Sequence, residues 1–546
     1  MPDSILVLGS GPIRIGQGIE FDYSCVHCVW ALNEMGYRAQ IINNNPETVS
    51  TDFDTGDGLF FEPVTLDDVV AVVRATGARG VVCQFGGQTA INLAEHLDAA
   101  GVSVLGTQPR AIALAEDRDQ FDALLNELGI RKPRGKAVTS VADAQRVVAE
   151  VGYPVLVRPS FVLGGRAMEI CFDDDQLAHF FAEAADANPG QPVLVDEYIL
   201  GQEAEVDVIS DGSDTLVPGV MEHIERAGVH SGDSMAVYPP VTLSGEVQVE
   251  MVRAACQIAR RLDVRGLMNI QFVIRDNQAY VLEVNPRASR TVPYLSKVTG
   301  IPMVQLATQC MMGKTLKELG FVSGLWQVAA GGRPGWVMPV GDMNADALEA
   351  TAPFYAVKAP VFSFQKLSKV EPSLGPEMKS TGEIMGLDFT FEAALYKALI
   401  ASHVTFKSSG YVVLTLDDRD KMFAVEIAEQ LRKFGIPIAA TAGTHAVLQQ
   451  AGIEARLVNK MLDGGENLVD LIRAGQVRLM INTPTHGKQS TIEAKLIRRT
   501  CIETGIACLT SVDTARALAK ALPLYENPEL SSCLPYNAYL AGRVLN

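Results

Sequence analysis

Short apolar segments alternate with helical segments at both ends of this chain, and that alternation limits the possible folds more than any other feature of the sequence. Strands joined by helices form parallel sheets, because a strand can reach a parallel neighbour only through a long crossover connection. The N-terminal strands are expected at residues 5–8, 39–42, 80–83 and 102–105. They predict a small parallel-sheet domain over residues 1–115.

The same pattern returns at the other end of the chain. Strands are expected there at residues 411–416, 438–440, 455–458, 478–481 and 506–509. Helical segments separate these strands, as they do at the N-terminus. The pattern therefore predicts a second compact parallel α/β domain over residues 406–546.

The middle of the chain has a different pattern. A helix expected over residues 117–128 opens it, and its strand candidates then come in pairs joined by Gly-rich or Asp-Asn turns. The pairs are residues 155–158 with 167–171, and residues 266–275 with 278–284. We expect an α+β unit built on antiparallel strands over residues 116–325, followed by a proline-rich connecting region over residues 326–405.

Composition excludes several classes of protein. The 546 residues exceed what one hydrophobic core can organise, and 64 acidic against 46 basic residues give a net charge of −18, which disfavours nucleic acid and anionic lipid as partners. The nine cysteines are scattered as in a protein with reduced thiols, and the N-terminus does not have the pattern of a signal sequence. We expect a multidomain cytoplasmic protein that binds neither nucleic acid nor membrane.

A glycine cluster, Gly9-Ser10-Gly11-Pro12 with Gly16 beyond it, follows the first expected strand. This position suits a dinucleotide-binding turn, but the spacing of the last glycine departs from the GxGxxG pattern. A tight structural turn, a substrate-binding loop and an NAD site remain open as interpretations.

A second loop gives a clearer signal. In the stretch VRPSFVLGGRAMEI, Arg158 ends a strand and is followed by the paired glycines Gly164 and Gly165, whose backbone amides can approach phosphate closely. This arrangement predicts a mobile cover over the phosphates of a nucleotide. An ordinary hairpin with an exposed arginine is the structural alternative.

Three side chains with hard oxygen donors are expected to converge on one hairpin. Alternation places Glu283 and Asn285 on the same face of a strand, and the turn at Asp276-Asn277 brings Gln271 of the preceding strand beside them. Mg²⁺ prefers carboxylate and amide oxygens together with nucleotide phosphates, whereas zinc would favour His or Cys. The sequence therefore predicts a magnesium site, with a solvated strand edge as the alternative.

Arg287 and Arg290 follow these expected ligands directly. Their planar guanidinium groups suit phosphate or a carboxylate-like acid. Phosphoryl transfer requires mainly that a protein position both reactants and neutralise the charge on the transferred group. A metal and two arginines can do this, so we expect an ATP- and Mg²⁺-dependent phosphotransferase of the ligase type that acts on a small acid.

The polar stretch MEHIERAGVHSGDS is unlike a core helix, and His230 within it is a candidate ligand contact as well as a candidate structural histidine. The sequence contains no Walker A, GxSxG, HExxH or clustered CxxC motif. P-loop, serine-hydrolase and zinc chemistry are therefore not supported.

The segments RPSFVLGGRAMEI, MEHIERAGVHSGDS, GLMNIQF and EVNPRASRT resemble the ATP-grasp fold, specifically the carboxy-terminal half of the carbamoyl phosphate synthetase large subunit. GSGPIRIGQGIEFDYSCVH and NNNPETVSTDFDT resemble the preceding pre-ATP-grasp domain of that half, and GPEMKSTGEIMG resembles the segment before its regulatory domain. The similarity thus covers nearly the whole chain. It implies phosphorylation of carbamate by ATP, with Mg²⁺ or Mn²⁺ as cofactor and K⁺ as a further candidate.

The resemblance also implies roles for individual residues. Those that would line the nucleotide are Arg118, Arg158, Gly164, Gly165, Glu197, Ile199, Glu203, Gly228, Val229, His230, Ser231, Gln271 and Glu283. Gln271, Glu283 and Asn285 would hold the metal, while Arg287 and Arg290 would handle the phosphoryl group and carbamate.

The C-terminal domain resembles the methylglyoxal-synthase-like allosteric domain of this family, which binds nucleotide effectors such as UMP. The residues implied for the effector site are Lys421, Thr441, Thr444, Lys460, Asn482 and Thr483. Where some relatives carry a Thr-His-Gly-Thr turn, this chain has Thr441-Ala442-Gly443-Thr444-His445, and its Thr485-His486-Gly487-Lys488 stretch also differs. The region over residues 323–346 is longer than is usual in this family.

A complete large subunit of this family carries two ATP-grasp halves, whereas this chain carries one and no recognisable glutaminase module. The resemblance therefore implies a split subunit. It would work with an amino-terminal, bicarbonate-phosphorylating section and a glutaminase small subunit, and its product would serve arginine or pyrimidine synthesis.

Two other functions remain open. Another ATP-grasp ligase, such as a biotin carboxylase or a purine-pathway ligase, would share the fold but not the acceptor, and the C-terminal domain argues against it. A non-catalytic regulatory subunit would keep nucleotide binding without turnover. The intact set Arg158, Gln271, Glu283, Asn285 and Arg290 argues against that class.

Overall fold

The computed structural model describes residues 3–159, 167–328, 335–348, 352–367, 369–459, 465–484 and 488–541. The chain divides into two compact units. The first comprises Met1–Glu222 and Tyr238–Ala352, and the second comprises His223–Val237 and Pro353–Asn546. The segment His223–Val237 thus clusters with the C-terminal part of the chain, away from its neighbours in sequence. No helix in the described ranges is long and apolar enough to cross a bilayer.

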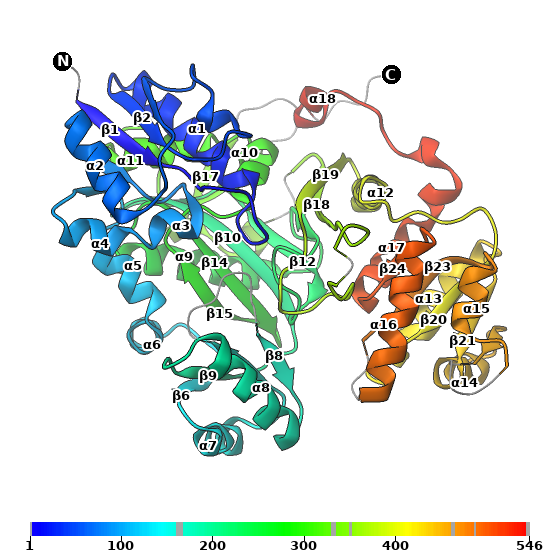
Figure 1. The fold of residues 1–546 in the computed structure, drawn as a ribbon. Helices are drawn as coiled ribbons and strands as arrows, with labels where there is room; N and C mark the ends of the chain where they lie inside the picture. The colour runs from blue at the N-terminus through cyan, green and yellow to red at the C-terminus, as the bar shows by residue number, and fades with distance from the viewer. Residues whose placement is uncertain are drawn as a thin grey trace. The chain divides into compact units, whose positions relative to one another are not determined.

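The first unit begins with a five-stranded parallel sheet in the order β3-β2-β1-β4-β5 (Figure 1). Its strands are β1 (Ser4–Leu8), β2 (Arg38–Ile42), β3 (Gly58–Phe60), β4 (Gly80–Val82) and β5 (Val104–Leu105). Its helices are α1 (Ile19–Glu34), α2 (Leu66–Thr76), α3 (Gly87–Ile91), α4 (Ala94–Ala99) and α5 (Pro109–Glu116). The four N-terminal strands expected from the sequence are confirmed. The short edge strand β3 was not predicted, although Leu59, Phe60 and Phe61 form a short apolar run there.

A four-stranded antiparallel sheet follows, in the order β6-β9-β7-β8. Its strands are β6 (Gly135–Val138), β7 (Val155–Pro159), β8 (Glu169–Cys171) and β9 (Val193–Glu197), and its helices are α6 (Arg118–Glu127), α7 (Val141–Val151) and α8 (Asp174–Ala187). The first predicted hairpin is confirmed, because Val155 lies opposite Cys171. The predicted helix is α6, whose first turn is capped by the side chain of Asp117.

The larger sheet of the first unit contains the second predicted hairpin. Its strands are β10 (Gln202–Asp211), β11 (Thr215–Val217), β14 (Arg265–Arg275), β15 (Gln278–Asn285), β16 (Gly324–Gln327) and β17 (Trp336–Pro339). Its helices are α9 (Gly245–Arg261), α10 (Val292–Thr299) and α11 (Met303–Met311). β14 pairs antiparallel with both β10 and β15. The turn between β14 and β15 places Asp276 and Asn277 at φ 52° and 58°, a region that Asp and Asn tolerate in two-residue hairpin turns.

Two strands, β12 (Val220–Arg226) and β13 (Ala236–Tyr238), are divided between the units. The rest of the second unit begins with the antiparallel pair β18 (Tyr355–Val361) and β19 (Gly382–Asp388), followed by α12 (Phe391–Ala401). These elements belong to the region that the sequence predicts as a connection. Their Val357, Ala359 and Leu395 share one hydrophobic core with the C-terminal domain.

The C-terminal domain has a five-stranded parallel sheet in the order β22-β21-β20-β23-β24. Its strands are β20 (Tyr411–Thr415), β21 (Ile438–Thr441), β22 (Arg456–Val458), β23 (Val477–Asn482) and β24 (Cys508–Leu509), as the sequence predicts. Its helices are α13 (Ala424–Lys433), α14 (Ala442–Gln450), α15 (Leu468–Arg473), α16 (Lys488–Glu503), α17 (Val512–Glu526) and α18 (Tyr536–Leu540).

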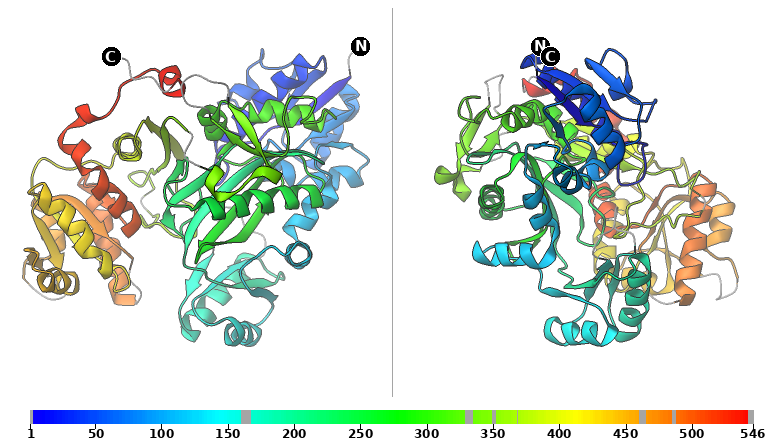
Figure 2. Two further views of the ribbon diagram at one scale, coloured as in Figure 1. Left: turned by 180° about the vertical axis from the view of Figure 1, so that it is seen from behind. Right: turned by 60° about the vertical axis from the view of Figure 1, so that its left-hand side comes forward.

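Helices cover both faces of this sheet, which Figure 2 shows in yellow and orange. Val412 and Leu414 of β20 join the core beneath α13 and α17, whereas Val413 between them joins the core beneath α15 and α16. Successive side chains of a strand point to opposite faces, so a continuous apolar run is what a doubly covered parallel strand requires.

Candidate functional site

Two rows of polar side chains cross one face of the sheet formed by β10, β14 and β15. In the first row, Glu205 pairs with Gln271, and Gln271 pairs with Glu283. In the second row, Asp207 pairs with Asn269, and Asn269 pairs with Asn285. Residues two apart on a strand share a face, and directly paired residues do as well. The hairpin therefore brings Gln271 beside Glu283, as predicted, and β10 adds two carboxylates.

Hydrogen bonds tie these rows together. The Asn269 Nδ2 lies 3.2 Å from Glu205 Oε2 and 3.2 Å from Asp207 Oδ1, and the Asn285 Nδ2 donates to Glu283 Oε1 at 2.9 Å. Burial, together with the neighbouring Glu205 carboxylate, raises the pKa of Asp207 to about 6, against hydrogen bonds that lower it. The face therefore concentrates negative charge in a place that water reaches poorly.

The donor set fits a hard divalent cation. Carboxylate and amide oxygens are the ligands that Mg²⁺ accepts, and a cation would relieve the repulsion between buried carboxylates. In the parts of the chain that the structure describes, no three His, Cys, Asp or Glu side chains form a group that could hold a metal. A metal on this face would thus depend on the amides of Gln271 and Asn285, and on phosphate oxygens, as well as on Glu283.

Arg287 and Arg290 both lie just beyond the end of β15. Arg287 is oriented by Gln88, whose Oε1 lies 3.1 Å from Nε, and by Asn285, whose Oδ1 lies 3.2 Å from Nη2. Burial lowers the pKa of Arg287, and the Glu283 carboxylate opposes that effect. Arg290 forms an ion pair with Glu20 of α1 at 2.7 Å.

Arg118 and Arg158, predicted to line the nucleotide, meet at Asp196 of β9. The Arg118 Nη2 lies 2.7 Å from Asp196 Oδ1, and the Arg158 Nε lies 3.4 Å from Asp196 Oδ2. The carboxylate is buried, with 7% of its side chain exposed, and it holds both guanidinium groups beside it. Sequence reasoning missed Asp196. Its signal was an acidic residue directly after the apolar run of β9 and next to Glu197.

The remaining predicted nucleotide residues of the first unit lie in several places. Glu197 forms ion pairs with Arg134 at 2.9 Å and Arg275 at 3.0 Å, and these guanidinium groups lower its pKa although burial alone would raise it. Ile199 and Glu203 are buried. Gly164 and Gly165, with the loop they were predicted to form, lie outside the described residues.

The loop over residues 227–234 belongs to the second unit, and it contains the predicted run Gly228, Val229, His230 and Ser231. Gly228 has φ 102°, a conformation that favours glycine. The Gly232 amide donates to His230 Nδ1 at 3.0 Å, so the imidazole proton of neutral His230 is on Nε2. The buried Asp233 accepts the backbone amides of Lys379 and Ser380 at 2.8 and 2.9 Å.

The N-terminal glycine cluster forms a tightly packed turn after β1. A Cβ at Gly9 would lie 2.4 Å from Asn43, and the amide of Gly11 donates to Asn43 Oδ1 at 3.0 Å. The side chain of Gln17 closes the turn by donating to the carbonyl of Ser10. These contacts favour the structural interpretation of the cluster over a dinucleotide site.

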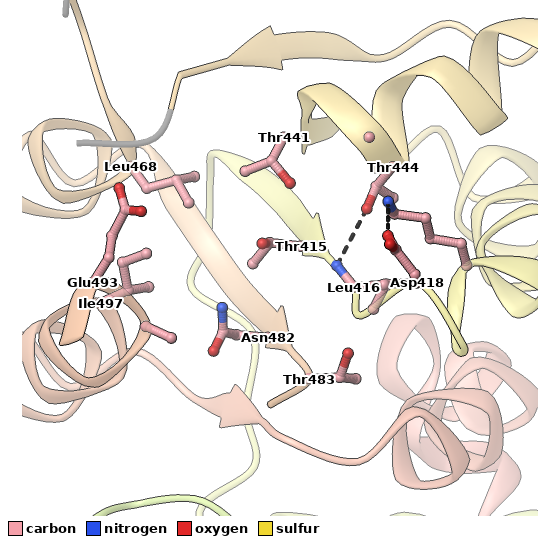
Figure 3. A pocket seen from close by; sticks show the side chains of 13 residues that line it. Thr415, Leu416, Asp418, Thr441, Thr444, Leu468, Asn482, Thr483, Glu493 and Ile497 are labelled. Carbon is pink, nitrogen blue, oxygen red and sulfur yellow. Dashed lines mark hydrogen bonds and ion pairs between the residues drawn. The ribbon is translucent and has the colours of Figure 1, made fainter. Parts of the chain in front are cut away.

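A pocket of about 100 Å³ opens at the carboxyl ends of β20, β21 and β23 (Figure 3). Parallel α/β sheets bind ligands at such an edge, where neighbouring strands connect in opposite directions. Five of the predicted effector residues line it: Lys421, Thr441, Thr444, Asn482 and Thr483. The sixth, Lys460, and the departing residues 485–487 lie outside the described residues.

One side of the pocket is suited to an anion. Lys421 and Gly443 lie there with Thr441 and Thr444, at the N-terminus of α14, and the first amides of a helix have no partner within the helix. Leu468, Glu493 and Ile497 form the other side, with Thr415 and Asn482 between (Figure 3). His445, a departure from some relatives, contacts the carbonyl of Ala455 at 3.1 Å.

Polar contacts around the pocket order its lining. The Leu416 amide donates to Thr444 Oγ1 at 3.2 Å, and the Asp417 amide donates to Thr483 Oγ1 at 2.7 Å. The buried Arg498 of α16 donates to Asn482 Oδ1 at 2.6 Å. Each threonine hydroxyl can still donate to a ligand while it accepts these amides.

Comparison with known proteins accords with this architecture. Family models match the carbamoyl phosphate synthase preATP-grasp domain over residues 1–114, the ATP-binding domain of the carbamoyl-phosphate synthase L chain over residues 117–319, and the MGS-like domain over residues 423–510. The pre-ATP-grasp, ATP-grasp and methylglyoxal-synthase-like domains expected from the sequence are thus present, and the ATP-grasp match supports an ATP-dependent ligase.

Two solved structures share the fold. The biotin carboxylase domain of 2-oxoglutarate carboxylase from Hydrogenobacter thermophilus, in complex with MgADP, ADP and bicarbonate, has a TM-score of 0.55 and 16% identity, and the match covers 74% of this chain and 90% of that chain. Biotin carboxylase from Campylobacter jejuni has a TM-score of 0.54 and 14% identity, with 73% of this chain and 91% of that chain covered. Identities this low show the fold alone.

Proposed function

We propose, from the premise that this chain belongs to the carbamoyl phosphate synthase large-subunit family, that it phosphorylates carbamate with ATP to give carbamoyl phosphate and ADP. The order of the three family matches is that of the carboxy-terminal half of the large subunit. The observation that carries the proposal is the double row on β10, β14 and β15, where carboxylates and amides precede two arginines.

The residues of this face would divide the work of phosphoryl transfer. Glu283, Gln271 and Asn285 would hold Mg²⁺ or Mn²⁺, which when bound neutralises charge on the nucleotide phosphates. Arg287, already fixed by Asn285 and Gln88, would hold the transferred phosphoryl group. Arg290 would orient carbamate, with Glu20 keeping its guanidinium in place.

The nucleotide would lie against Arg118 and Arg158. Their shared partner Asp196 orients both guanidinium groups before ATP arrives, which reduces the ordering cost of binding. Residues 227–234, which we call the nucleotide loop, would contact the nucleotide through Gly228, Val229, His230 and Ser231. The resemblance of MEHIERAGVHSGDS to the family supports this role.

The pocket of the C-terminal domain would bind a nucleotide effector such as UMP. Its lysine, threonine hydroxyls and helix N-terminus suit a phosphate, and its apolar side suits a nucleoside. The partners would be a bicarbonate-phosphorylating ATP-grasp section, on this or another chain, and a glutaminase subunit. These would supply carbamate to the site described here.

Purified protein mixed with ADP, Mg²⁺ and carbamoyl phosphate tests the activity, since the reverse reaction forms ATP. Glu283→Ala should abolish ATP formation. Gln278→Ala, at the exposed start of the same strand, should leave it unchanged. ATP formation that survived Glu283→Ala would remove the metal assignment.

The same preparation separates the alternatives. Biotin-dependent hydrolysis of ATP, without ATP formation from carbamoyl phosphate, would replace the proposal with a biotin carboxylase, the class that the two solved structures represent. Tight ATP binding without either reaction in the presence of both partner subunits would indicate a regulatory subunit.

A further inference from the structure

The two ends of the nucleotide loop are fastened to different elements of the second unit. At its far end, the His230 amide donates to the Gly375 carbonyl at 2.8 Å, and Asp233 accepts the amides of Lys379 and Ser380. At its near end, β12 delivers Glu225 and Arg226. All of these residues belong to the same compact unit.

The near end docks on the start of α17. Arg226 Nε lies 2.7 Å from Asp513 Oδ2, and the Arg226 backbone amide donates to the same oxygen at 3.2 Å. Glu225 Oε1 accepts the Thr514 hydroxyl at 2.6 Å. These bonds are largely shielded from water, because Asp513 is 10% exposed and Glu225 is buried. They fix the chain immediately before Gly228.

The same arginine reaches the effector pocket. Its Nη2 lies 3.0 Å from Asp420 Oδ1, and its guanidinium carbon lies 5.4 Å from the centre of the Phe423 ring. Asp420 and Phe423 flank Lys421 on one helical turn, and Lys421 lines the pocket. Arg226 thus holds both sides of the turn that carries the cation of the pocket.

The Lys421 ammonium group already forms an ion pair within this turn when no ligand is bound. Lys421 Nζ is paired with the exposed Asp418, which also lines the pocket (Figure 3). A phosphate that binds Lys421 competes with Asp418 for the same ammonium group, so it changes the interactions of the turn over residues 418–423. A ligand can shift an equilibrium by as much as its interactions differ between two states.

We infer that Arg226 is a positioning residue for the nucleotide loop. We also infer that a ligand bound in the pocket changes the interactions of Arg226, through Asp420 in the turn over residues 418–423. The inference rests on the proposed roles of the nucleotide loop and of the pocket. It predicts that the affinities for ADP and for a nucleoside monophosphate are linked, and that Asp420 carries the link.

Asp420→Asn in the full chain tests the link, with UMP as the probe. In the wild type, we expect UMP to change the dissociation constant of ADP at least about fivefold, the lower end of typical allosteric coupling, and ADP to change the UMP dissociation constant by the same factor. In Asp420→Asn, both changes should fall below about twofold. Its kcat without UMP and its UMP affinity without ADP should match the wild type.

Glu426→Gln is the matched control. Glu426 holds Arg516 at 2.9 Å, and Arg516 stacks on the same Phe423 ring at 4.4 Å, so this variant removes a comparable carboxylate from the neighbouring ion pair. It should keep the full response to UMP. Arg226→Gln should raise the KM for ADP with little change in kcat, and Arg226→Lys should recover part of that KM.

Each outcome has a distinct meaning. A full response to UMP in Asp420→Asn overturns the inference. It is also overturned if Arg226→Gln lowers kcat and stability but leaves the KM for ADP unchanged. A wild type that forms ATP but ignores UMP overturns the inference and the effector proposal, and leaves the carbamate reaction standing. A wild type that forms no ATP rejects the proposed reaction, while calorimetric titration of UMP with and without ADP still decides the link.

Discussion

Asp196 is the carboxylate that Arg118 and Arg158 share in the candidate nucleotide site, whereas Asp122 pairs with Arg118. It contacts both Arg118 and Arg158 while nearly buried, so the two guanidinium groups are oriented without a ligand. Hydrogen bonds to charged groups contribute about 1.5–3 kcal/mol each, which corresponds to a tenfold or larger effect on binding. The loss of this carboxylate should therefore lower the affinity for the nucleotide more than it lowers the stability of the protein.

We expect Asp196→Asn to raise the KM for ADP about tenfold in the ATP-forming reaction, with a smaller change in kcat, because the amide no longer holds the guanidinium charges. Asp119→Asn, at an exposed position on α6, should behave as the wild type. An unchanged KM in Asp196→Asn would show that Arg118 and Arg158 do not bind the nucleotide through these side chains.

Glu225 should give the second unit a dependence on pH. Burial raises its pKa to about 7 from an ordinary value of 4.5, against the hydrogen bonds from Thr514 and the Met235 amide. Between these two values the folded state binds more protons than the unfolded state, so stability falls as pH rises. Glu225→Gln removes this dependence of stability on pH. The thermal midpoint of the variant, relative to that of the wild type, should therefore rise from pH 5 to pH 8. A difference that stayed constant with pH would contradict the assignment.

Among the elements, the hairpin β14–β15 was the most predictable. Its turn residues, alternation and strand lengths are local, and they were enough to place Gln271 beside Glu283. Glu205 and Asp207 could not be placed in the same way, because their position depends on how β10 pairs with β14, more than 60 residues away. Their alternation in the sequence shows a shared face, but not which neighbour that face meets.

Helix α14 offers a test at the scale of an element, since its N-terminus and Lys421 form one side of the pocket. A Cβ at Gly443 would lie 2.4 Å from Lys421 Nζ, the mobile end of a flexible side chain, so Gly443→Ala should displace the ammonium at little cost in stability. We expect UMP affinity to fall about tenfold, the loss of one charge-assisted contact.

In the same comparison, ATP formation without UMP should be unchanged in Gly443→Ala. The exposed Ala446→Ser on the same helix should bind UMP as the wild type does. Calorimetric titration measures both affinities. Equal affinity in Gly443→Ala and wild type would place the phosphate of the effector elsewhere.

At the scale of the whole molecule, the compact units and the order of the sequence disagree over one segment. The family match for the ATP-binding domain runs over residues 117–319, yet His223–Val237 within it clusters with the C-terminal unit. Met235 and Val237 are buried in the same core as β20 and α17. The sequence could not reveal this, because apolar residues in a short strand do not say which core they enter.

Hydrogen exchange in the intact protein should show that His223–Val237 belongs to the C-terminal unit. The Ile224 amide donates to the Met235 carbonyl at 2.8 Å. Amides that open together exchange with a common free energy, so we expect Ile224 to become exposed with the amides of β20, at the same denaturant concentration. Exchange of Ile224 together with β14 instead would assign the segment to the first unit.

Arg226 also limits how such proteins can be recombined. A chimera that takes its regulatory domain from a relative, with the junction between β19 and β20, separates Arg226 from Asp420 and Asp513, since the three are far apart in sequence. The grafted domain would then face the half-buried guanidinium of Arg226 without the carboxylates that match it. A functional exchange must therefore transfer residues 223–237 together with the regulatory domain. The part to be exchanged thus consists of two separate stretches of the gene.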